Sequence, residues 1–259
     1  MGTKKYFFFD YDGTLAISHT KTIPASTRKT LDLLREQGHF VALNTGRLQC
    51  NAVDYVQSAG IDNIVADGGY SVTLDGQLQW MRSLDLEPVK TCLRRLDAAG
   101  IPWSVTTKNE LFRYSNNPDF ATIAGDYYVP TVYDPDLTID SLERVYKAYI
   151  PCELDRAQDL ADTGLLDGVP WVTYTSSTVF IEPLSKDVGI RYVMDHFDAP
   201  VKDVVVFGDG KNDLSMFCPE WTSIAMGNAL DLLKDHADYV TDDCDKNGIF
   251  NACRHFGWI

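Results

Sequence analysis

The sequence has few basic residues for its length, and this shortage excludes two classes of partner. Its 259 residues include 23 Lys and Arg against 37 Asp and Glu, which gives a formal net charge of −14. Nucleic-acid-binding proteins carry a basic patch, and an anionic membrane would repel so acidic a surface. We therefore expect neither nucleic acid nor a membrane as a partner. An anionic substrate would be helped by a bound cation.

The sequence also lacks metal-binding cysteine spacings and long apolar runs. Its six cysteines include no C-x-x-C pair, so we expect reduced, mostly buried thiols and no zinc ribbon. The apolar run Tyr6–Phe9 is far too short for a signal peptide or a membrane span. A soluble, cytoplasmic protein is expected. Nothing in the sequence indicates an oligomeric state.

Alternating strand and helix patterns dominate the first eighty residues. Apolar residues make up 45 % of the chain, enough for the core of one large or two modest domains. Short apolar runs predict buried strands, and apolar stripes with Ser or Gly at their ends predict helices. The predicted strands are 6–9, 40–43 and 61–66, and the helices are 26–37, with Ser26 as its cap, and 48–59. This order predicts a parallel sheet with right-handed crossovers.

The pattern changes after this segment and later returns. Residues 71–80 alternate around Asp75-Gly76, which predicts a hairpin. Beyond it we expect a helix at 86–98, strands at 101–106 and 110–114, helices near 141 and 155, and strands at 171–175 and 179–184. A helix at 187–197 and a strand at 204–207 restore the first pattern. The predicted fold class is α/β, a Rossmann-like parallel-sheet core (1–81 and 185–259) with an inserted α+β cap (82–184).

Chemistry-bearing residues gather in four short segments. Ligand sites in open parallel sheets lie beyond the carboxyl ends of the strands, so segments that follow core strands should converge. The four are Asp10–Thr14 (DYDGT), Asn44–Arg47 (NTGR), Lys186, and Gly208–Asp213 (GDGKND).

The two acidic segments have calcium loops as the competing interpretation. Counted from Asp10, the twelfth position holds Lys21 instead of the bidentate Glu that such a loop needs. Counted from Asp209, Glu220 is in place, but Lys211 occupies a ligand position and Leu214 replaces the required Gly. Paired carboxylates that supply a nucleophile, an acid/base and a magnesium site are favoured instead.

The other two segments are weaker signals on their own. Residues 44–47 lie between a strand and a helix, where a hydroxyl and free backbone N–H groups can hold a phosphate. A lone lysine such as Lys186 is usually a solvated surface residue, and only its place between the insertion and the returning core singles it out. Together the four segments supply what phosphoryl transfer needs.

The four segments resemble the four motifs of the haloacid dehalogenase-like phosphatases, and the large insertion resembles the Cof-type branch of that family. The tail is similar too, with Ala225–Ala229, Ala237–Thr241 and Gly248. The resemblance spans the whole chain. It implies a magnesium-dependent phosphatase that acts on a small phosphorylated metabolite, with a sugar phosphate as the expected class.

The resemblance also implies roles for the acidic residues. Asp10 would form an aspartyl-phosphate and bind Mg²⁺. Asp12 would protonate the leaving group and then activate water, while its backbone carbonyl touches the metal. Asp209 would bind Mg²⁺ directly, and Asp213 would support the waters on the metal.

The remaining family positions would hold the phosphate. Thr45 and Gly46 would bind the transferring group, and Asn212 would reach it. Lys186 would hold the charges of the nucleophile and the phosphate together. Thr45 and Lys186 would complete the catalytic set with Asp10 and Asp12.

Two departures and two alternatives accompany this interpretation. Asp67-Gly68-Gly69 stands where the branch usually has Asn-Gly-Ala, and Asp187 stands where Gly is common.

The alternatives are a phosphomutase of the phosphomannomutase type and a catalytically silent metabolite-binding protein. A mutase needs a positive site for a second phosphate, but residues 82–184 hold nine basic against sixteen acidic residues. Of the basic residues, Arg94, Arg95 or Arg113 could still form a local pocket.

Overall fold

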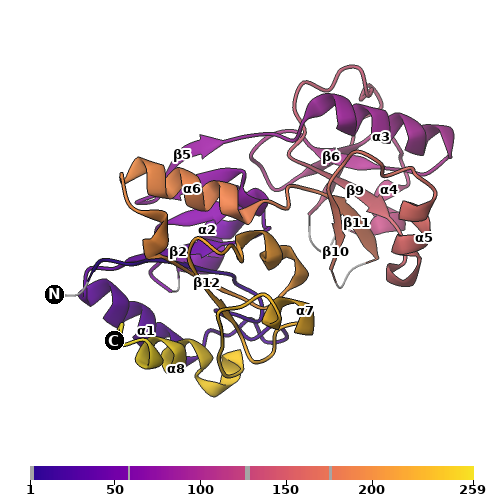
Figure 1. The fold of residues 1–259 in the computed structure, drawn as a ribbon. Helices are drawn as coiled ribbons and strands as arrows, with labels where there is room; N and C mark the ends of the chain where they lie inside the picture. The colour runs from indigo at the N-terminus through magenta and orange to yellow at the C-terminus, as the bar shows by residue number, and fades with distance from the viewer. Residues whose placement is uncertain (1–2, 58, 126–128, 175–176) are drawn as a thin grey trace. The chain divides into compact units, whose positions relative to one another are not determined.

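A computed structural model describes residues 3–57, 59–125, 129–174 and 177–259, and its chain divides into two compact units (Figure 1). Residues 1–81 and 185–259 form the first, which we call the core unit. Residues 82–184 form the second, the inserted unit. Each unit has its own sheet and its own apolar core.

The core unit is built on an eight-stranded sheet in the order β14-β13-β12-β1-β2-β3-β4-β5. The strands from β14 to β3 pair in parallel, and β4 and β5 continue the sheet antiparallel. Their bounds are β1 Tyr6–Phe9, β2 Phe40–Asn44, β3 Ile64–Ala66, β4 Ser71–Leu74, β5 Gln77–Met81, β12 Val204–Gly208, β13 Thr222–Ala225 and β14 Tyr239–Val240.

Helices cover both faces of this sheet, which explains why its strands read as unbroken apolar runs. They are α1 Ala25–Glu36, α2 Gln49–Gln57, α6 Lys186–His196, α7 Asp231–Lys234 and α8 Gly248–His255. Phe7 and Phe9 pack with α1, α2 and α8, while Phe8 packs with α6 and α7 on the other face. Figure 1 shows α1 and α8 side by side, with α6 across the sheet from them. All four residues of β1 are buried as a result.

The inserted unit has a six-stranded sheet in the order β10-β11-β9-β6-β7-β8. Its strands are β6 Ser104–Thr106, β7 Arg113–Ser115, β8 Thr131–Tyr133, β9 Lys147–Pro151, β10 Trp171–Thr173 and β11 Thr178–Ile181, and its helices are α3 Leu86–Ala98, α4 Phe120–Ala124 and α5 Ala157–Asp162. One face packs apolar side chains such as Val105 and Ile150 against α3 and α5. The other face carries polar side chains, including the buried ion pair Lys147–Glu182. The predicted α/β fold class is confirmed.

Several local expectations need correction. Helix α1 begins at Ala25 after Pro24, and no side chain among the described residues caps it, so Ser26 is not its cap. The helix expected near Ser141 is a turn, which Ser141 and Thr138 close by exchanging side-chain-to-backbone hydrogen bonds. Central strand β9 was missed. Positions 58 and 175 of the predicted elements lie outside the described residues.

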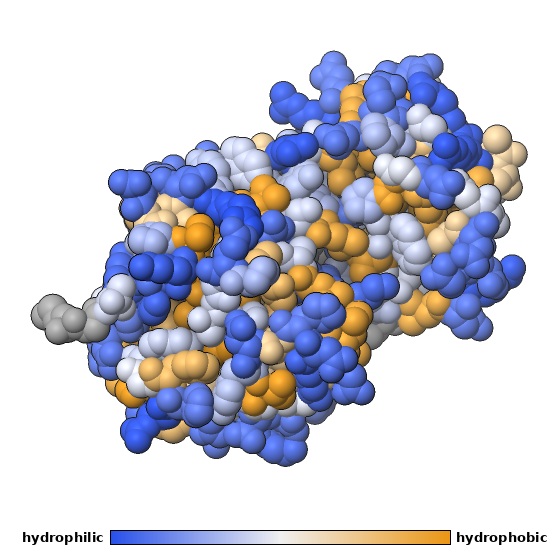
Figure 2. Space-filling view, viewed as in Figure 1, coloured by the Kyte–Doolittle hydropathy of each residue, from blue (hydrophilic) through white to orange (hydrophobic). Residues whose placement is uncertain are grey.

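The hairpin prediction is confirmed: Asp75 and Gly76 both adopt positive φ between β4 and β5, as a tight hairpin turn requires. Hydrophilic side chains cover most of the face shown in Figure 2, with small apolar patches between them. In the part of the chain that the structure describes, no helix is both long and apolar enough to cross a bilayer.

Candidate active site

The predicted site residues follow three adjacent strands of the core sheet. Asp10 follows β1, Thr45 follows β2, and Asp209 follows β12. Because β1 pairs in parallel with both β2 and β12, these residues leave one edge of the sheet together. Lys186 is an exception to the expectation that every segment follows a core strand. It is the first residue of α6 and enters the site from the point where the chain returns from the inserted unit.

The Lys186 ammonium lies at the centre of the site and is 1 % exposed. Its Nζ donates to Asp10 Oδ1 at 2.6 Å, to Asp213 Oδ1 at 2.6 Å and to the Asn44 carbonyl oxygen at 2.9 Å. An ammonium has three hydrogens, so these contacts use all of its donors. Lys186 therefore fixes two carboxylates. The solvated surface position that is usual for a lone lysine does not apply here.

Asp213 connects this lysine to the loop that carries Asp209. Its Oδ2 accepts hydrogen bonds from the backbone N–H groups of Asp209 and Gly210, both at 2.9 Å, while its Oδ1 accepts from Lys186. Asp213 is fully buried, and a side chain at Gly208 would collide with it. The carboxylate of Asp213 thus holds the loop after β12 in place, in addition to any role toward a metal.

Residues of the first segment, Asp10–Thr14, hold the carboxylate of Asp209 in place. Thr14 Oγ1 donates to Asp209 Oδ1 at 3.1 Å. Gly13 has a φ of +85°, and a Cβ there would overlap the Asp209 carboxylate, so only glycine suits this position. Asn228 in turn donates to the Gly13 carbonyl oxygen at 2.9 Å. The two acidic segments therefore fit each other closely.

Burial and mutual repulsion disturb the ionisation of these carboxyls. Burial, with added repulsion from Asp213, raises the pKa of Asp10 to about 7 although Lys186 opposes the change. Burial, together with the charges of Asp10 and Asp213, raises the pKa of Asp209 to about 8. Burial lowers the pKa of Lys186, but Asp10 and Asp213 outweigh it and the net change is upward. Lys186 therefore stays charged, but its single positive charge does not cancel the repulsion among the carboxylates of Asp10, Asp209 and Asp213.

This donor set fits a divalent cation. Asp10, Asp209 and Asp213 each offer a carboxylate oxygen, and these oxygens lie within 4.8 Å of one another. Three carboxylates face one ammonium, so a bound cation would relieve the repulsion that helps to raise the pKa values of Asp10 and Asp209. Hard oxygen ligands in a small cluster match the preference of Mg²⁺.

The segment after β2 differs in one respect from the expected phosphate cradle. Residues 45–48 form a loop, and α2 begins only at Gln49, whose N–H already donates to Asp67 Oδ2 at 3.1 Å. The first N–H group of that helix is therefore occupied. The buried Thr45 keeps its hydroxyl on this loop, and Gly46 is half-buried beside it. Asn212 is half-buried on the loop after β12.

Asp12 lies apart from the buried cluster. Its Oδ2 accepts a hydrogen bond from Arg47 Nη2 at 2.6 Å, and its Oδ1 contacts Lys21 Nζ. Its side chain is 36 % exposed, compared with 9 % for Asp10. The two carboxylates of the first segment thus have different surroundings: one is buried against a lysine, and the other lies at the surface between two cations.

The unusual segment Asp67-Gly68-Gly69 holds the start of α6. The Gly68 carbonyl oxygen accepts from the Ser185 N–H at 3.0 Å, and a Cβ at Gly69 would overlap the Ser185 carbonyl. Lys186 N–H donates to Ser215 Oγ at 2.9 Å. The Asp67 segment therefore supports Lys186 from the residue that precedes it.

Four supporting residues were not assigned roles from the sequence: Thr14, Asn44, Ser215 and Asn228. Thr14, Asn44 and Asn228 lie inside the segments that carried the resemblance, so their positions were visible although their contacts were not. Ser215 follows the last segment by two residues and carried no signal.

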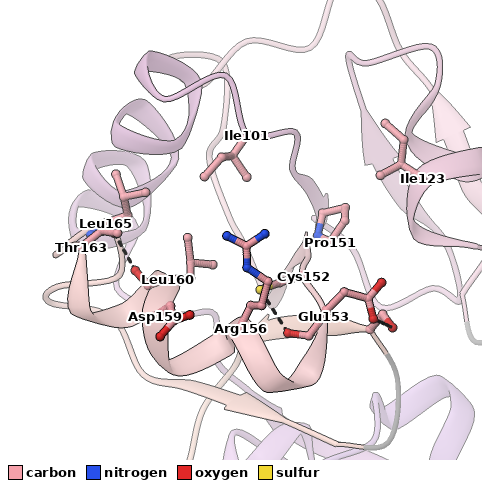
Figure 3. A pocket seen from close by; sticks show the side chains of 11 residues that line it. Ile101, Ile123, Pro151, Cys152, Glu153, Arg156, Asp159, Leu160, Thr163 and Leu165 are labelled. Carbon is pink, nitrogen blue, oxygen red and sulfur yellow. Dashed lines mark hydrogen bonds between the residues drawn. The ribbon is translucent and has the colours of Figure 1, made fainter.

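A separate cavity lies within the inserted unit and contains none of the predicted site residues. Its volume is about 530 Å³, and apolar side chains such as Ile101, Ile123 and Leu160 line it. Figure 3 shows Arg156 pointing across it toward Ile101. Acidic Glu153 and Asp159 also line the cavity, so it offers no uniform charge to a ligand.

Comparison with known proteins gives the family. A family model described as haloacid dehalogenase-like hydrolase matches residues 7–253. The chain belongs to the haloacid dehalogenase-like hydrolases. It is 30 % identical to the putative phosphatase YkrA of Bacillus subtilis, over 98 % of both chains. The predicted family, including its Cof-type branch, is confirmed, as is the prediction of an enzyme of the phosphatase class.

Solved structures agree with this family. A hypothetical protein from Geobacillus kaustophilus superposes with a TM-score of 0.81 at 27 % identity, covering 99 % of this chain and all of the other. The HAD subclass IIB sugar phosphatase BT4131 superposes with a TM-score of 0.79 at 25 % identity and the same coverage. Two further relatives are named for their substrates: YitU of Bacillus subtilis is a 5-amino-6-(5-phospho-D-ribitylamino)uracil phosphatase, and a relative from Yersinia pestis is an HMP-PP phosphatase.

Proposed function

We propose that this protein hydrolyses a small phosphomonoester in a magnesium-dependent reaction through an aspartyl-phosphate on Asp10. The observation that supports this most is the buried cluster in which Lys186 contacts both Asp10 and Asp213 at 2.6 Å while Asp209 lies beside them. A buried lysine that fixes a carboxylate at a strand end suits a preorganised nucleophile. All six cysteines are free, in keeping with a reducing, cytoplasmic location.

The proposed reaction has two displacements at phosphorus. An Asp10 carboxylate oxygen attacks the phosphorus, and the bond to the leaving oxygen breaks while Asp12 gives that oxygen its proton. Asp12, now a carboxylate, then takes a proton from water as the water oxygen attacks the phosphorus. The bond to Asp10 breaks, which releases inorganic phosphate and restores the Asp10 carboxylate. The hydroxyl of Thr45, the N–H of Gly46 and the amide of Asn212 would hold the phosphate oxygens.

In this proposal Asp10, Asp209 and the backbone carbonyl of Asp12 would hold Mg²⁺, with Asp213 behind its waters. When bound, the cation supplies positive charge that offsets the phosphate and the carboxylates. Lys186 has a separate task, since its three hydrogens are used within the protein. It keeps Asp10 and Asp213 at fixed positions and keeps part of their charge neutralised.

The arrangement of basic residues in the inserted unit argues against a mutase. Arg94 donates to Asp140, Arg95 to the carbonyl oxygens of Gly164 and Asp167, and Arg113 to Thr131 and to the Gly125 carbonyl. Each of the three candidate arginines for a second phosphate therefore has partners in its own unit. The alternative of a silent binding protein is disfavoured by the complete set of Asp10, Asp12, Lys186 and Asp209.

For the substrate we propose a sugar or sugar-alcohol phosphate. Among the relatives, BT4131 is a sugar phosphatase, and YitU of Bacillus subtilis acts on 5-amino-6-(5-phospho-D-ribitylamino)uracil and is 25 % identical over 99 % of both chains. Both substrates carry a phosphate on a polyhydroxylated carbon chain. We further propose that the inserted unit selects among such substrates.

The test is a screen of phosphorylated metabolites with Mg²⁺, in which release of inorganic phosphate is measured. Sugar and polyol monophosphates are expected to react, and Asp10→Asn should lower kcat by several orders of magnitude while the protein remains folded by circular dichroism. A hexose 1-phosphate with a catalytic amount of its bisphosphate should yield free phosphate. Faster formation of the 6-phosphate isomer would identify a mutase, and wild-type turnover by Asp10→Asn would exclude Asp10 as the nucleophile.

A further inference from the structure

Of the two predicted catalytic carboxylates, Asp12 is the less buried, so contacts with neighbouring side chains must hold it in position. Its side chain is 36 % exposed, whereas Asp10 and Asp213 are buried among fixed partners. The two cations at its carboxylate are Arg47 at 2.6 Å and Lys21. The orientation of this carboxylate is therefore set by whichever of the two cations is itself fixed.

Arg47 is held both at its backbone and at its guanidinium group. Its side chain is 14 % exposed, and its guanidinium carbon lies 4.0 Å from the centre of the Tyr55 ring and 5.7 Å from that of Tyr11. The two rings themselves meet edge to face at 5.1 Å. The backbone of Arg47 is held as well, because its N–H donates to Thr45 Oγ1 at 3.2 Å and its carbonyl accepts from Asp67 N–H at 2.8 Å. Planar stacking with charge-assisted hydrogen bonding is what a guanidinium offers and an ammonium does not.

Lys21 is held less firmly. Its side chain is 50 % exposed and reaches Asp12 on a flexible stem. Exposed lysine–carboxylate pairs contribute little, because ordering the long side chain costs entropy and solvent screens the charges. Arg47, and not Lys21, is thus the contact that determines where the Asp12 carboxylate lies.

We propose that Arg47 is a positioning residue that orients Asp12 for proton transfer to the leaving group and from water, an inference that rests on the proposed function. A general acid or base must lie within about 2.6–3.2 Å of the atom with which it exchanges a proton. The rings of Tyr55 and Tyr11 hold the guanidinium of Arg47 in place, and Arg47 in turn holds the carboxylate of Asp12. The phosphate-binding residue Thr45 is part of the same arrangement through the Arg47 N–H, so the acid and the phosphate site share one support.

The competing role for Arg47 is direct binding of the phosphate, and the leaving group distinguishes the two roles. An alkyl phosphate has a poor leaving group that needs a proton, while p-nitrophenyl phosphate releases a stable phenolate. A positioning residue for the acid affects the first substrate selectively. A phosphate ligand affects both.

The experiment compares wild type, Arg47→Met, Asp12→Asn and the double variant in pre-steady-state phosphorylation, which isolates the first displacement. With a sugar phosphate, Arg47→Met should slow phosphorylation by about 100-fold, within the usual range for general acid catalysis. With p-nitrophenyl phosphate the initial burst should change by less than about threefold, while the later steady state slows because Asp12 also serves as the base. The double variant should be no slower than Asp12→Asn, because both changes remove one function.

Further variants control for structure. Arg191→Met is the matched control: Arg191 also pairs with a carboxylate, Glu220, and stacks on a ring, that of Trp221 at 5.0 Å, and its loss should leave the kinetics unchanged. Tyr55→Leu should reproduce part of the Arg47→Met effect. Arg47→Lys should recover only part of the activity, since an ammonium cannot stack in the same way.

The outcomes separate the two proposals. Equal loss on both substrates, or additive effects in the double variant, would overturn the positioning role. An Asp12→Asn variant as fast as wild type on the sugar phosphate, or a wild type that hydrolyses neither substrate, would overturn the proposed function and this inference with it.

Discussion

Replacement of Lys186 by Met should have opposite effects on folding and on metal binding. The change removes a side chain that is 1 % exposed and makes three hydrogen bonds of 2.6 to 2.9 Å. It leaves Asp10 and Asp213 buried without their cation. Removal of one partner from a buried ion pair costs about 3–5 kcal/mol, so the free energy of unfolding at pH 8 without metal should fall by that amount.

The loss should shrink as the pH is lowered. The pKa of Asp10 is about 7 even with Lys186 lowering it, so it rises further in the variant. A raised carboxyl pKa means that the folded state binds a proton that the unfolded state releases, and this favours folding at lower pH. At pH 6 the variant should therefore recover a large part of the lost stability.

The affinity for Mg²⁺ should move the other way. With one positive charge fewer beside the carboxylates, Lys186→Met should bind Mg²⁺ at least about tenfold more tightly at pH 8.5, a gain of about 1.4 kcal/mol, although turnover is lost. Chemical denaturation and titration calorimetry measure the two effects. The control is Lys147→Met, which breaks a buried lysine pair elsewhere in the protein, that of Lys147 with Glu182 in the inserted unit. It should lower stability without a change in Mg²⁺ affinity. Weaker or unchanged binding in Lys186→Met would refute the assignment of this cluster as the metal site.

Three further predictions follow from the same geometry. Without metal, the wild type should become more stable as the pH falls from about 8 toward 5, because burial and repulsion raise the pKa of Asp10 to about 7 and of Asp209 to about 8. Mg²⁺ should abolish this trend, and melting curves that do not change with pH in chelator would contradict it. Gly69→Ala should lower kcat at least about tenfold with little change in KM, since the added Cβ displaces Ser185 and with it Lys186. Gly76→Ala is the control for positive-φ strain alone, because no atom of the described residues lies within 4 Å of the Cβ that it adds. Replacement of residues 82–184 by a short Gly-Ser linker should abolish discrimination among sugar phosphates while p-nitrophenyl phosphate still reacts; unchanged discrimination would place specificity in the core unit.

The strands of the core sheet could be predicted because each forms a short pattern that can be recognised in the sequence by itself. Residues 6–9 and 204–207 are unbroken apolar runs, and such runs arise when helices cover both faces of a parallel sheet. The hairpin at Asp75-Gly76 was visible for a similar reason, since few residues tolerate its backbone angles.

The inserted unit was harder because tertiary contacts decide its elements. Strand β9 contains Lys147, which suggests an exposed position, yet the lysine is buried because Glu182 on a distant segment pairs with it. The turn at Ser141 likewise depends on one pair of side chains, Ser141 and Thr138, that the apolar periodicity does not register.

At the candidate site, sequence indicated the residue types but not their division of labour. Three of the four segments follow core strands, so their convergence could be expected. Lys186 does not, and no local pattern reveals that all three of its hydrogens would be used inside the protein. Nor does the spacing of Asp10 and Asp12 show that one is buried and the other half-buried.

The supports of the site form a sequence of contacts, and this has a consequence for variation in the chain. Gly68 and Gly69 hold Ser185, the next residue is Lys186, Lys186 holds Asp10 and Asp213, and Asp213 holds the loop of Asp209. A change early in this sequence must act through every later contact, because Lys186 is the only cation that hydrogen-bonds to Asp213 among the described residues. By contrast, Arg47 and Asp12 depend on Tyr55 and Tyr11 instead. The side chains that support the nucleophile and the acid thus differ, but both supports meet at the Asp67 segment, because the Asp67 N–H donates to the Arg47 carbonyl oxygen and Gly68 accepts from the Ser185 N–H. A substitution of a supporting side chain away from that segment, such as Tyr55, should therefore impair one function of the site and leave the geometry of the other intact.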